Sequence, residues 1–477
     1  MWNFLINQIS QHREAIFFDK DNRITYSILM NIVKQKGDIL KGRLKPKSKC
    51  AILCNSNFKS AVAILACWYS DLIPIPMSKH YGESHCNNII LLTCPDLLIT
   101  DDITLKSEYD IFGFNIDNNE FYGEYHKNPC EFILEDIAII MCTSGTTGNP
   151  KGVMITEKSL IENVVNISKY FKITCNDTIL IARPLYHCAV LTGEFLISLF
   201  YGVNICFFDD IYNPLAIIKS INENCITVLC GTPTLINHIA TFYKRNKETS
   251  NMRTIAISGE CLSELVAKNI RGIFVNTNIY NVYGLTEAAP RVSYLFPELF
   301  DEYSESVGAP LNGIIIKIVN DNFQELPQNE IGNIIVDSPS VMKGYYRNTG
   351  LTESTVKNGW LKTGDLGYIN EKGLLYIISR ADDMIIKAGM NIYPKEIETK
   401  LKTNKSIYDV VAYRIKTHNG QGIALDVVLS AESKTLAKRE LMNICAGVLP
   451  SYQFPDEINI VDNLQKNASG KVIRHNR

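Results

Sequence analysis

The residues best suited to chemistry lie in one segment, Ile137–Gly152, which reads IAIIMCTSGTTGNPKG. An apolar stretch of β-strand character leads into a loop of hydroxyl side chains and glycines that contains one lysine. Glycines let backbone N–H groups approach an anion closely, hydroxyls donate to phosphate oxygens, and lysine adds positive charge. The loop is therefore predicted to bind phosphate through Thr143, Ser144, Gly145, Thr146, Thr147, Gly148 and Lys151.

This loop differs from a Walker loop. Asn149 and Pro150 separate its second glycine from the lysine, whereas a Walker loop needs the lysine directly after the last glycine. A P-loop kinase or GTPase is therefore disfavoured. The alternative is an ordinary polar surface turn, but four hydroxyls and three glycines within ten residues exceed what a turn requires.

Three further segments carry groups that suit a nucleotide. Asn281–Glu287 (NVYGLTE) follows a β-like stretch, and Glu287 is a candidate Mg²⁺ ligand. Asp365 lies in a KTGDLG turn and could accept two hydrogen bonds from a ribose diol. Lys471 follows a short NASG segment near the carboxyl end. Taken singly, each has an ordinary alternative, namely a helix cap, a turn-forming aspartate and a solvated tail. The set as a whole points to nucleotide chemistry.

The elements that must position these segments follow an alternation of short β-branched stretches and longer helical ones. Strands are expected at 51–53, 73–75, 227–229, 254–257 and 279–282, with a helix at 58–70 between the first two. Parallel sheets covered by helices are the usual packing for such a βαβ pattern. The fold class is therefore predicted as α/β, or α+β for the chain as a whole.

The pattern changes in the last third of the chain. Closely spaced strands with polar turns predict a smaller, β-rich and more antiparallel subdomain at about 313–380. Near Arg380, the tripeptide Ala381-Asp382-Asp383 interrupts two apolar stretches. We expect a domain boundary there. It separates a large N-terminal domain, 1–380, from a small C-terminal α+β domain, 381–477.

Composition excludes several other classes of protein. The chain has 477 residues, of which 46% are apolar, and its 48 Lys and Arg nearly balance 50 Asp and Glu. A net charge of −2 gives no electrostatic case for a nucleic-acid partner. The longest apolar stretch, near 60–77, is interrupted by Asp71 and two prolines, so no membrane span is expected. The N-terminal residues lack the pattern of a secretion signal, and a cytoplasmic location is expected.

The motifs at Thr143, Tyr283, Asp365 and Lys471 resemble, in their order, those of the adenylate-forming (AMP-binding) enzymes. This superfamily includes acyl-CoA synthetases, aryl-CoA ligases, firefly luciferase and the adenylation domains of nonribosomal peptide synthetases. The resemblance covers nearly the whole chain. It implies that the C-terminal domain is a mobile lid that carries a catalytic lysine, and that ATP and Mg²⁺ are required.

The resemblance also implies roles for individual residues around the nucleotide. Mg²⁺ would be held by Glu287 and Thr147, and Thr286 would meet the α-phosphate. Asp365 and Arg380 would contact the ribose. The adenine would be bound by Gly259, Glu260, Cys261, Gly284 and Tyr283, with the tyrosine ring stacked on the base.

Two half-reactions are implied in turn. A carboxylate attacks the α-phosphorus of ATP, which gives an acyl-adenylate and pyrophosphate, and the acyl group then passes to a phosphopantetheine thiol. Lys471 would serve the adenylation, Asp382 would be the hinge between the domains, and Gly389 would face the thiol in the second half-reaction.

The acyl pocket is expected to draw on 184–193 and 231–233, with His187, Cys188, Thr192, Gly231 and Gly284 as its residues. His187 occupies the family's gate position, and the alternative is a hydrogen-bonded core histidine. Amino-acid-activating relatives carry an aspartate just after this segment, where this chain has Cys188-Ala-Val. An aliphatic or aryl acid is therefore favoured over an α-amino acid, although Glu194 could serve an amine elsewhere on the substrate.

The acceptor thiol leaves alternatives open. The segment Gly389–Ile397 (GMNIYPKEI) looks more like CoA ligases than like peptide-synthetase domains, which favours CoA. A stand-alone enzyme that loads an acyl or aminoacyl group onto a discrete carrier protein would show the same motifs. A non-catalytic nucleotide-binding relative is the alternative of another class, and the joint presence of Glu287, Asp365 and Lys471 argues against it.

Overall fold

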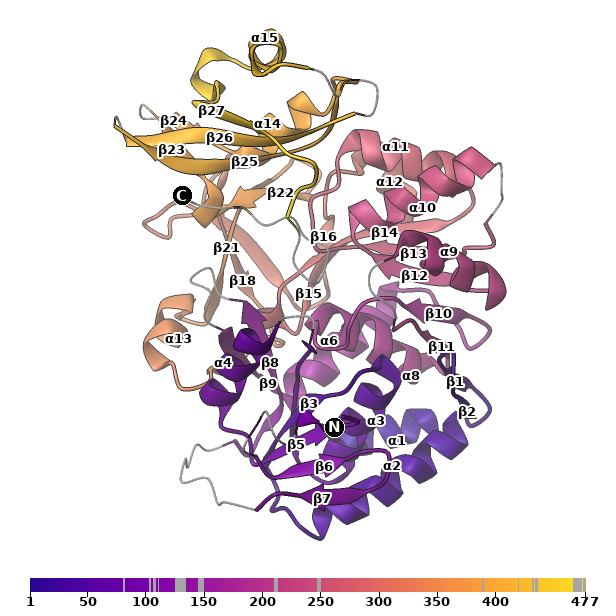
Figure 1. The fold of residues 1–477 in the computed structure, drawn as a ribbon. Helices are drawn as coiled ribbons and strands as arrows, with labels where there is room; N and C mark the ends of the chain where they lie inside the picture. Colours follow the sequence, from indigo (N-terminus) through magenta and orange to yellow (C-terminus); the bar gives the residue numbers. More distant parts are fainter. Residues whose placement is uncertain are drawn as a thin grey trace. The chain divides into compact units, whose positions relative to one another are not determined.

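A computed structural model describes residues 1–79, 82–102, 104–105, 109, 111–124, 134–144, 150–209, 213–246, 250–387, 390–418, 420–430, 433, 436–465 and 474 (Figure 1). The chain forms two compact units. The first consists of Met1–Ile315 and Val336–Leu361, and the second of Ile316–Ile335 and Lys362–Arg477. Most of the predicted β-rich segment 313–380 thus groups with the C-terminal part of the chain. The domain boundary expected near Arg380 stays a prediction.

The larger sheet of the first unit has nine strands within the described residues. Five parallel strands form its centre: β10 (Thr178–Ile181), β11 (Asn204–Phe207), β12 (Val228–Gly231), β13 (Thr254–Ile257) and β14 (Asn278–Gly284). Next to β11 come β1 (Ile16–Phe18) and β2 (Arg23–Thr25), and next to β14 come β15 (Arg291–Leu295) and β16 (Ala309–Pro310). Strands β12 and β13 are buried throughout. This explains why the sequence shows continuous apolar stretches here instead of alternation.

Helices connect the parallel strands of this sheet. They are α9 (Pro214–Glu223), α10 (Pro233–Asn246) and α11 (Glu264–Ile273), which lie beside β12 to β14 (Figure 1). The side chain of Asn213 caps α9 by accepting from the N–H groups of Leu215 and Ala216, and Pro214 takes the first helical position. The predicted strands at 227–229, 254–257 and 279–282 and their parallel pairing are confirmed.

A second, five-stranded sheet belongs to the same unit. Its strands are β3 (Lys49–Leu53), β4 (Ile73–Pro76), β5 (Leu97–Thr100), β6 (Gly113–Asn115) and β7 (Glu120–Tyr122), in the order β4-β3-β5-β6-β7. Its helices are α3 (Asn57–Tyr69) and α4 (Glu83–Thr93), and α1 (Trp2–Ile9) and α2 (Tyr26–Lys41) both contact α3. The run from β3 through α3 to β4 confirms the predicted βαβ unit. Phe58 and the eight consecutive residues 61–68 are buried, which explains why α3 is apolar all round after Lys59 and Ser60.

The strand that leads into the predicted phosphate loop belongs to a small three-stranded sheet. It is formed by β8 (Ile137–Ser144), β9 (Pro150–Thr156) and β19 (Gly344–Tyr345), and α6 (Glu157–Tyr170) follows β9. Strands β8 and β9 pair in an antiparallel manner, with Thr143 opposite Lys151. The loop therefore joins two strands of a hairpin, whereas a Walker loop joins a strand to a helix. This agrees with the exclusion made from the lysine spacing.

Shorter elements complete the first unit. Three consecutive helical segments are α7 (Cys188–Val190), the π-helix η2 (Leu191–Leu196) and α8 (Ile197–Tyr201). The others are η3 (Thr286–Ala288), η4 (Pro297–Leu299), α12 (Phe300–Tyr303), α13 (Thr349–Thr355) and β20 (Val356–Lys357). The predicted acyl-pocket segment 184–193 thus ends in a π-helix, an irregular form that is often found at functional sites.

The second unit is an α+β assembly. Its first part contains most of β17 (Ile315–Val319), β18 (Gly332–Asp337) and β21 (Trp360–Ile369) and all of β22 (Leu375–Arg380), followed by η5 (Ala381–Asp383). Its second part contains β23 (Ile385–Lys387), β24 (Met390–Ile392), α14 (Pro394–Leu401), β25 (Ile407–Thr417), β26 (Gly420–Leu429), α15 (Lys438–Val448), η7 (Ser451–Gln453) and β27 (Glu457–Ile460). Residues Ile385, Ile397, Ile423 and Leu441 belong to one apolar core here. Within the described residues, no helix is long and apolar enough to cross a membrane.

Candidate active site

The carboxyl ends of β12, β13 and β14 lie next to one another in the large sheet. The strand register pairs Gly231 with Ile257, and Ile257 with Asn281. The segments that follow these strands are therefore neighbours at one sheet edge, where open α/β sheets bind ligands. The structure thus brings together three predicted groups of residues, which begin at Gly231, Ser258 and Tyr283.

The segment after β13 is held by its neighbours. Gly259 has φ +92°, a conformation that favours glycine. The Oε2 atom of Glu260 accepts a hydrogen bond from the hydroxyl of Thr234, at 3.0 Å, at the start of α10. Ser258 is buried. Gly259, Glu260 and Cys261 therefore form a turn that is tied to α10, and their contact with adenine stays a prediction.

The residues at the end of β14 and just after it differ in their exposure to solvent. Tyr283 is buried, Gly284 is exposed, and Thr286 and Glu287 are half-buried. A Cβ atom on Gly284 would lie 2.1 Å from the carbonyl oxygen of Pro290, so no side chain fits there. The chain at Gly284 is therefore exposed but closely backed by β15, which suits a wall against which a ligand packs.

Glu287 and Lys151 both lie close to Tyr345, a residue that the sequence analysis did not select. The hydroxyl of Tyr345 donates to Oε1 of Glu287 at 2.7 Å, and Nζ of Lys151 lies 5.7 Å from the centre of the Tyr345 ring. Tyr345 lies in β19 and pairs with Val153 of β9. The strand that carries the phosphate-loop lysine thus comes close to the carboxylate after β14. A carboxylate held by a phenol near a lysine fits a site for Mg²⁺ and phosphate.

His187 lies just before α7 and is half-buried. Its Nε2 atom is buried and has no hydrogen-bond partner among the residues that the structure describes. Burial, with a smaller contribution from Arg183, lowers the pKa of His187 to about 3, so the ring is neutral at pH 7. A hydrogen-bonded core histidine would have its Nε2 satisfied. The unpartnered Nε2 does not fit that alternative, and the gate role of His187 stays a prediction.

The other predicted pocket residues of this segment are neutral as well. Cys188 is buried, and burial raises the pKa of its thiol to about 12. Thr192 is fully buried in η2. The pocket wall from 187 to 192 therefore offers an imidazole, a thiol and a hydroxyl without net charge.

Glu194 is fully buried and already paired. Its Oε1 atom accepts from Nη2 of Arg183 at 2.5 Å, and burial raises the pKa of its carboxyl although Arg183 opposes this shift. Arg183 follows β10 and also lies 3.4 Å from the hydroxyl of Ser258. Sequence reasoning missed Arg183, although an arginine two residues after a buried strand was a signal. The Oε2 atom of Glu194 is buried without a hydrogen-bond partner among the described residues, so a substrate amine that reached Glu194 would share the carboxylate with this guanidinium.

In the second unit, the two residues predicted to bind ribose are partners. Asp365 in β21 lies opposite Arg380 in β22, and Nη1 of Arg380 lies 3.0 Å from Oδ1 of Asp365. Asp365 is buried, whereas Arg380 is exposed. Gly364 has φ +74°, and a Cβ there would come within 2.9 Å of the Arg380 guanidinium. The predicted pair is thus preformed, and its contact with ribose stays a prediction.

Several predicted residues lie outside this description. Asp382 is the exposed middle residue of η5, and its role as a hinge is untested. The residues outside the described ranges are Gly145, Thr146, Thr147, Gly148, Gly389 and Lys471, and the side chain of Ser144 is also outside them.

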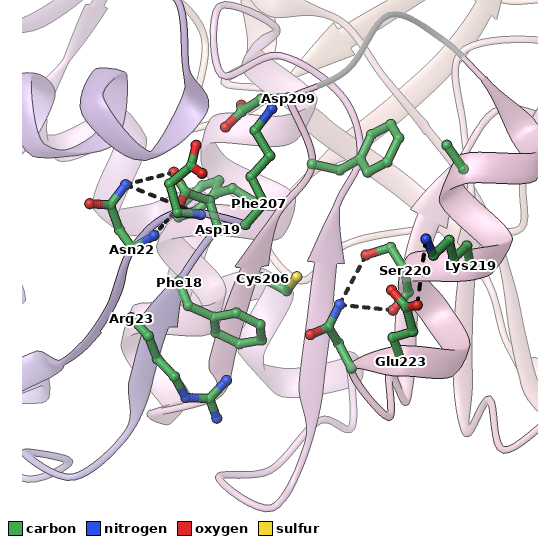
Figure 2. Close-up of a pocket in the computed structure, with 15 residues that line it drawn as sticks. Phe18, Asp19, Asn22, Arg23, Cys206, Phe207, Asp209, Lys219, Ser220 and Glu223 are labelled. Atoms are coloured by element: carbon green, nitrogen blue, oxygen red, sulfur yellow. Dashed lines mark hydrogen bonds and ion pairs between the residues drawn. The ribbon is translucent and has the colours of Figure 1, made fainter.

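A hollow of about 650 Å³ lies elsewhere, at the carboxyl ends of β1 and β11 (Figure 2). None of the predicted site residues lines it. The polar side chains around it bond to each other: Asn22 donates to Asp19 at 3.0 Å, and Lys219 lies 3.7 Å from Glu223 (Figure 2). We therefore assign the candidate site to the ends of β12, β13 and β14.

Comparison with known proteins identifies the family of the chain. Residues 6–346 match the AMP-binding enzyme family, and residues 396–471 match the AMP-binding enzyme C-terminal domain. The 2-succinylbenzoate–CoA ligase of Bacillus licheniformis is 32% identical over 95% of this chain and 94% of its own. The o-succinylbenzoate coenzyme A synthetase of Bacillus subtilis, solved with ATP and magnesium ion, has a TM-score of 0.87 and 28% identity, and 99% and 98% of the two chains are covered. A long-chain-fatty-acid–CoA ligase of Escherichia coli is 30% identical over 76% of this chain and 65% of its own.

The chain belongs to the AMP-binding enzyme family, the adenylate-forming enzymes that its motifs resemble. Within this family it is an ATP-dependent, AMP-forming acyl-CoA ligase. The predicted fold class is confirmed, with parallel sheets in a large N-terminal part and a small α+β C-terminal domain.

Proposed function

We propose that the ligase activates an aliphatic or aryl carboxylic acid without an α-ammonium group. The observation that carries this proposal is the buried ion pair between Arg183 and Glu194. An α-ammonium needs a carboxylate partner when it is buried, because an unpaired buried charge costs several kcal/mol. Glu194 is already bound by Arg183, and the nearby His187 and Cys188 are neutral. This wall suits a neutral carbon skeleton beside the reacting carboxylate.

The residues at the sheet edge have the following proposed roles in adenylation. The carboxylate oxygen attacks the α-phosphorus, and the bond to the pyrophosphate oxygen breaks. Thr286 donates to the α-phosphate, and Lys151 offsets the charge of the outer phosphates. Mg²⁺, when bound, is held by Glu287 and Thr147 and supplies further charge neutralisation. These groups hold the reactants in line and take no covalent part.

The second half-reaction transfers the acyl group. The thiol sulfur of CoA attacks the acyl carbon, and AMP leaves with the bonding electron pair. For this step, Lys471 leaves the site and the loop at Gly389 approaches it, with Asp382 as the hinge. Asp365 and Arg380 keep the ribose in place through both steps. A discrete carrier protein, the alternative acceptor, presents the same phosphopantetheine arm as CoA. The two acceptors differ only in what is attached to that arm.

ATP–pyrophosphate exchange across a panel of acids tests the proposal. The panel contains short and medium fatty acids, aryl acids, 2-succinylbenzoate and the twenty standard amino acids. 2-Succinylbenzoate is included because full-length relatives are named for it. We expect exchange with at least one acid and none above background with the amino acids. Robust exchange with one α-amino acid would overturn the proposed acid class, and exchange with no acid would favour a non-catalytic relative.

The acceptor is tested with the best acid and ATP. Free CoA at millimolar concentration is compared with candidate holo-carrier proteins at micromolar concentration. Acyl-CoA is the expected product. Acyl-carrier product without acyl-CoA would reverse this assignment.

A further inference from the structure

A buried arginine, Arg291, lies between two parts of the predicted acyl pocket. It is 5% exposed and is the first residue of β15. The strand register places it opposite Gly284, one of the predicted pocket residues. A Cβ on Gly193 would lie only 2.5 Å from Nη2 of Arg291. The arginine side chain therefore extends from the end of β14 to the π-helix η2, where a glycine leaves room for it.

The charges around Arg291 do not balance. Arg183 and Arg291 are two cations, and Glu194 is the one anion that interacts with both. The Oε1 atom of Glu194 is bonded to Arg183. Among the residues that the structure describes, the Nε atom of Arg291 is buried without a hydrogen-bond partner, and so is the Oε2 atom of Glu194.

Other titratable groups near Arg291 do not supply the missing anion. Burial raises the pKa values of the Cys188 and Cys230 thiols and of the Tyr170 hydroxyl, so all three are neutral at pH 7. The carboxylate of Glu287 accepts from the neutral hydroxyl of Tyr345, and its proposed partner is Mg²⁺. The buried cluster of Arg183, Glu194 and Arg291 therefore carries one positive charge in excess, which is costly without a partner.

We infer that Arg291 binds a second carboxylate of the acid substrate, remote from the carboxylate that is activated. A guanidinium is planar and matches a carboxylate with two parallel hydrogen bonds. This assignment rests on the proposed function and narrows it, because it makes the substrate a dicarboxylic acid. The activated carboxylate lies toward Thr286, and the second one lies at Arg291, between Gly284 and Gly193. The carbon skeleton then passes the neutral wall at His187 and Cys188.

The test compares diacids with their half-esters, in which the remote carboxylate is a methyl ester. We measure kcat/KM in ATP–pyrophosphate exchange for succinate, glutarate, adipate and 2-succinylbenzoate and for each matched half-ester. For at least one pair, the wild type is expected to prefer the diacid by about 100-fold or more, because a site built to bond a group rejects the analogue that lacks it. A wild type that uses half-esters as well as diacids would overturn the inference.

The variant Arg291→Gln separates a substrate contact from a structural role. This variant is expected to raise KM for the diacid. The ratio of kcat/KM for the diacid to kcat/KM for the half-ester should then fall to about threefold or less, while kcat/KM for the half-ester stays close to that of the wild type. Arg291→Lys keeps the charge without the planar fork and should recover part of the preference. Equal losses for diacid and half-ester would instead mean that Arg291 only neutralises Glu194, and the inference would be wrong.

Two controls keep the outcome clear. Arg245→Met removes an exposed arginine at the end of α10 and should leave kcat/KM unchanged for both the diacid and the half-ester. If Arg291→Gln fails to fold, the wild-type preference and Arg291→Lys decide the question. Exchange with monocarboxylic acids but with no diacid overturns this inference alone. Exchange with no acid at all overturns the proposed function as well.

Discussion

Replacing Tyr345 by phenylalanine should weaken Mg²⁺ binding during adenylation while it leaves the fold intact. The variant keeps the ring near Lys151 and removes the hydroxyl that donates to Glu287 at 2.7 Å. A hydrogen bond to a charged group contributes about 1.5–3 kcal/mol. Loss of such a partner of a metal ligand typically lowers metal affinity by about 10–100-fold. We therefore expect the half-saturating Mg²⁺ concentration to rise by at least about tenfold.

The assay is ATP–pyrophosphate exchange with Mg²⁺ titrated at saturating acid and ATP. Tyr408→Phe is the matched control, since Tyr408 is 68% exposed, and it should behave as the wild type. Thermal unfolding of both variants shows whether the fold is kept. If Tyr345→Phe showed the wild-type Mg²⁺ dependence, the position of Glu287 would not depend on this hydrogen bond, and its role as the metal ligand would lose its structural support.

Three further predictions concern a glycine, a histidine and a lysine. Gly284→Ala should lower the free energy of unfolding by about 1–3 kcal/mol and reduce exchange, because the new Cβ would lie 2.1 Å from the oxygen of Pro290. Gly272→Ala, where a Cβ meets nothing within 4 Å, should not destabilise the protein in the same denaturant titration. The pKa of His187 is about 3 in the folded protein and 6.5 as its ordinary value, so the unfolded chain binds more protons between these limits. The stability due to neutral His187 is thus fully present above pH 6.5 and is lost as the pH falls toward 3, so the wild type should lose stability faster than His187→Gln between pH 7 and pH 4. Parallel curves for the two proteins would contradict this. Lys471→Ala should reduce adenylate formation by about 3–4 kcal/mol of transition-state stabilisation, while thioester formation from supplied acyl-adenylate survives. Equal loss of both half-reactions with the fold intact would remove Lys471 from its role.

The motifs and the strands that carry them were readable from local sequence. The strands at 254–257 and 279–282 are short and continuously buried because both faces of a parallel sheet are covered. The polar segments that follow them could be expected to be neighbours, since parallel strands end at one sheet edge. The hydroxyls, glycines and lysine of 143–152 likewise predict a phosphate loop from residue type and spacing alone.

Other parts of the site depend on contacts between distant segments. Tyr345 reaches Glu287 across 58 positions of the chain, and this contact requires β19 to pair with β9. No spacing within the sequence specifies that pairing. Periodicity describes one helix or strand at a time, so it cannot predict a contact between two distant elements.

The sequence by itself determined the family, the order of the motifs and the residue types available for nucleotide chemistry, because these depend on local pattern. Only the tertiary structure decided which charges are already neutralised. From the sequence, Glu194 could be assigned to a substrate amine, whereas in the fold its Oε1 atom is bonded to Arg183. Arg291 gave no signal in the sequence, yet the fold places its guanidinium beside Gly193 and buries its Nε atom without a hydrogen-bond partner in the described residues. The physical reason is that the energy of a buried charge depends on its neighbours in space, and strand order and helix packing bring those neighbours together.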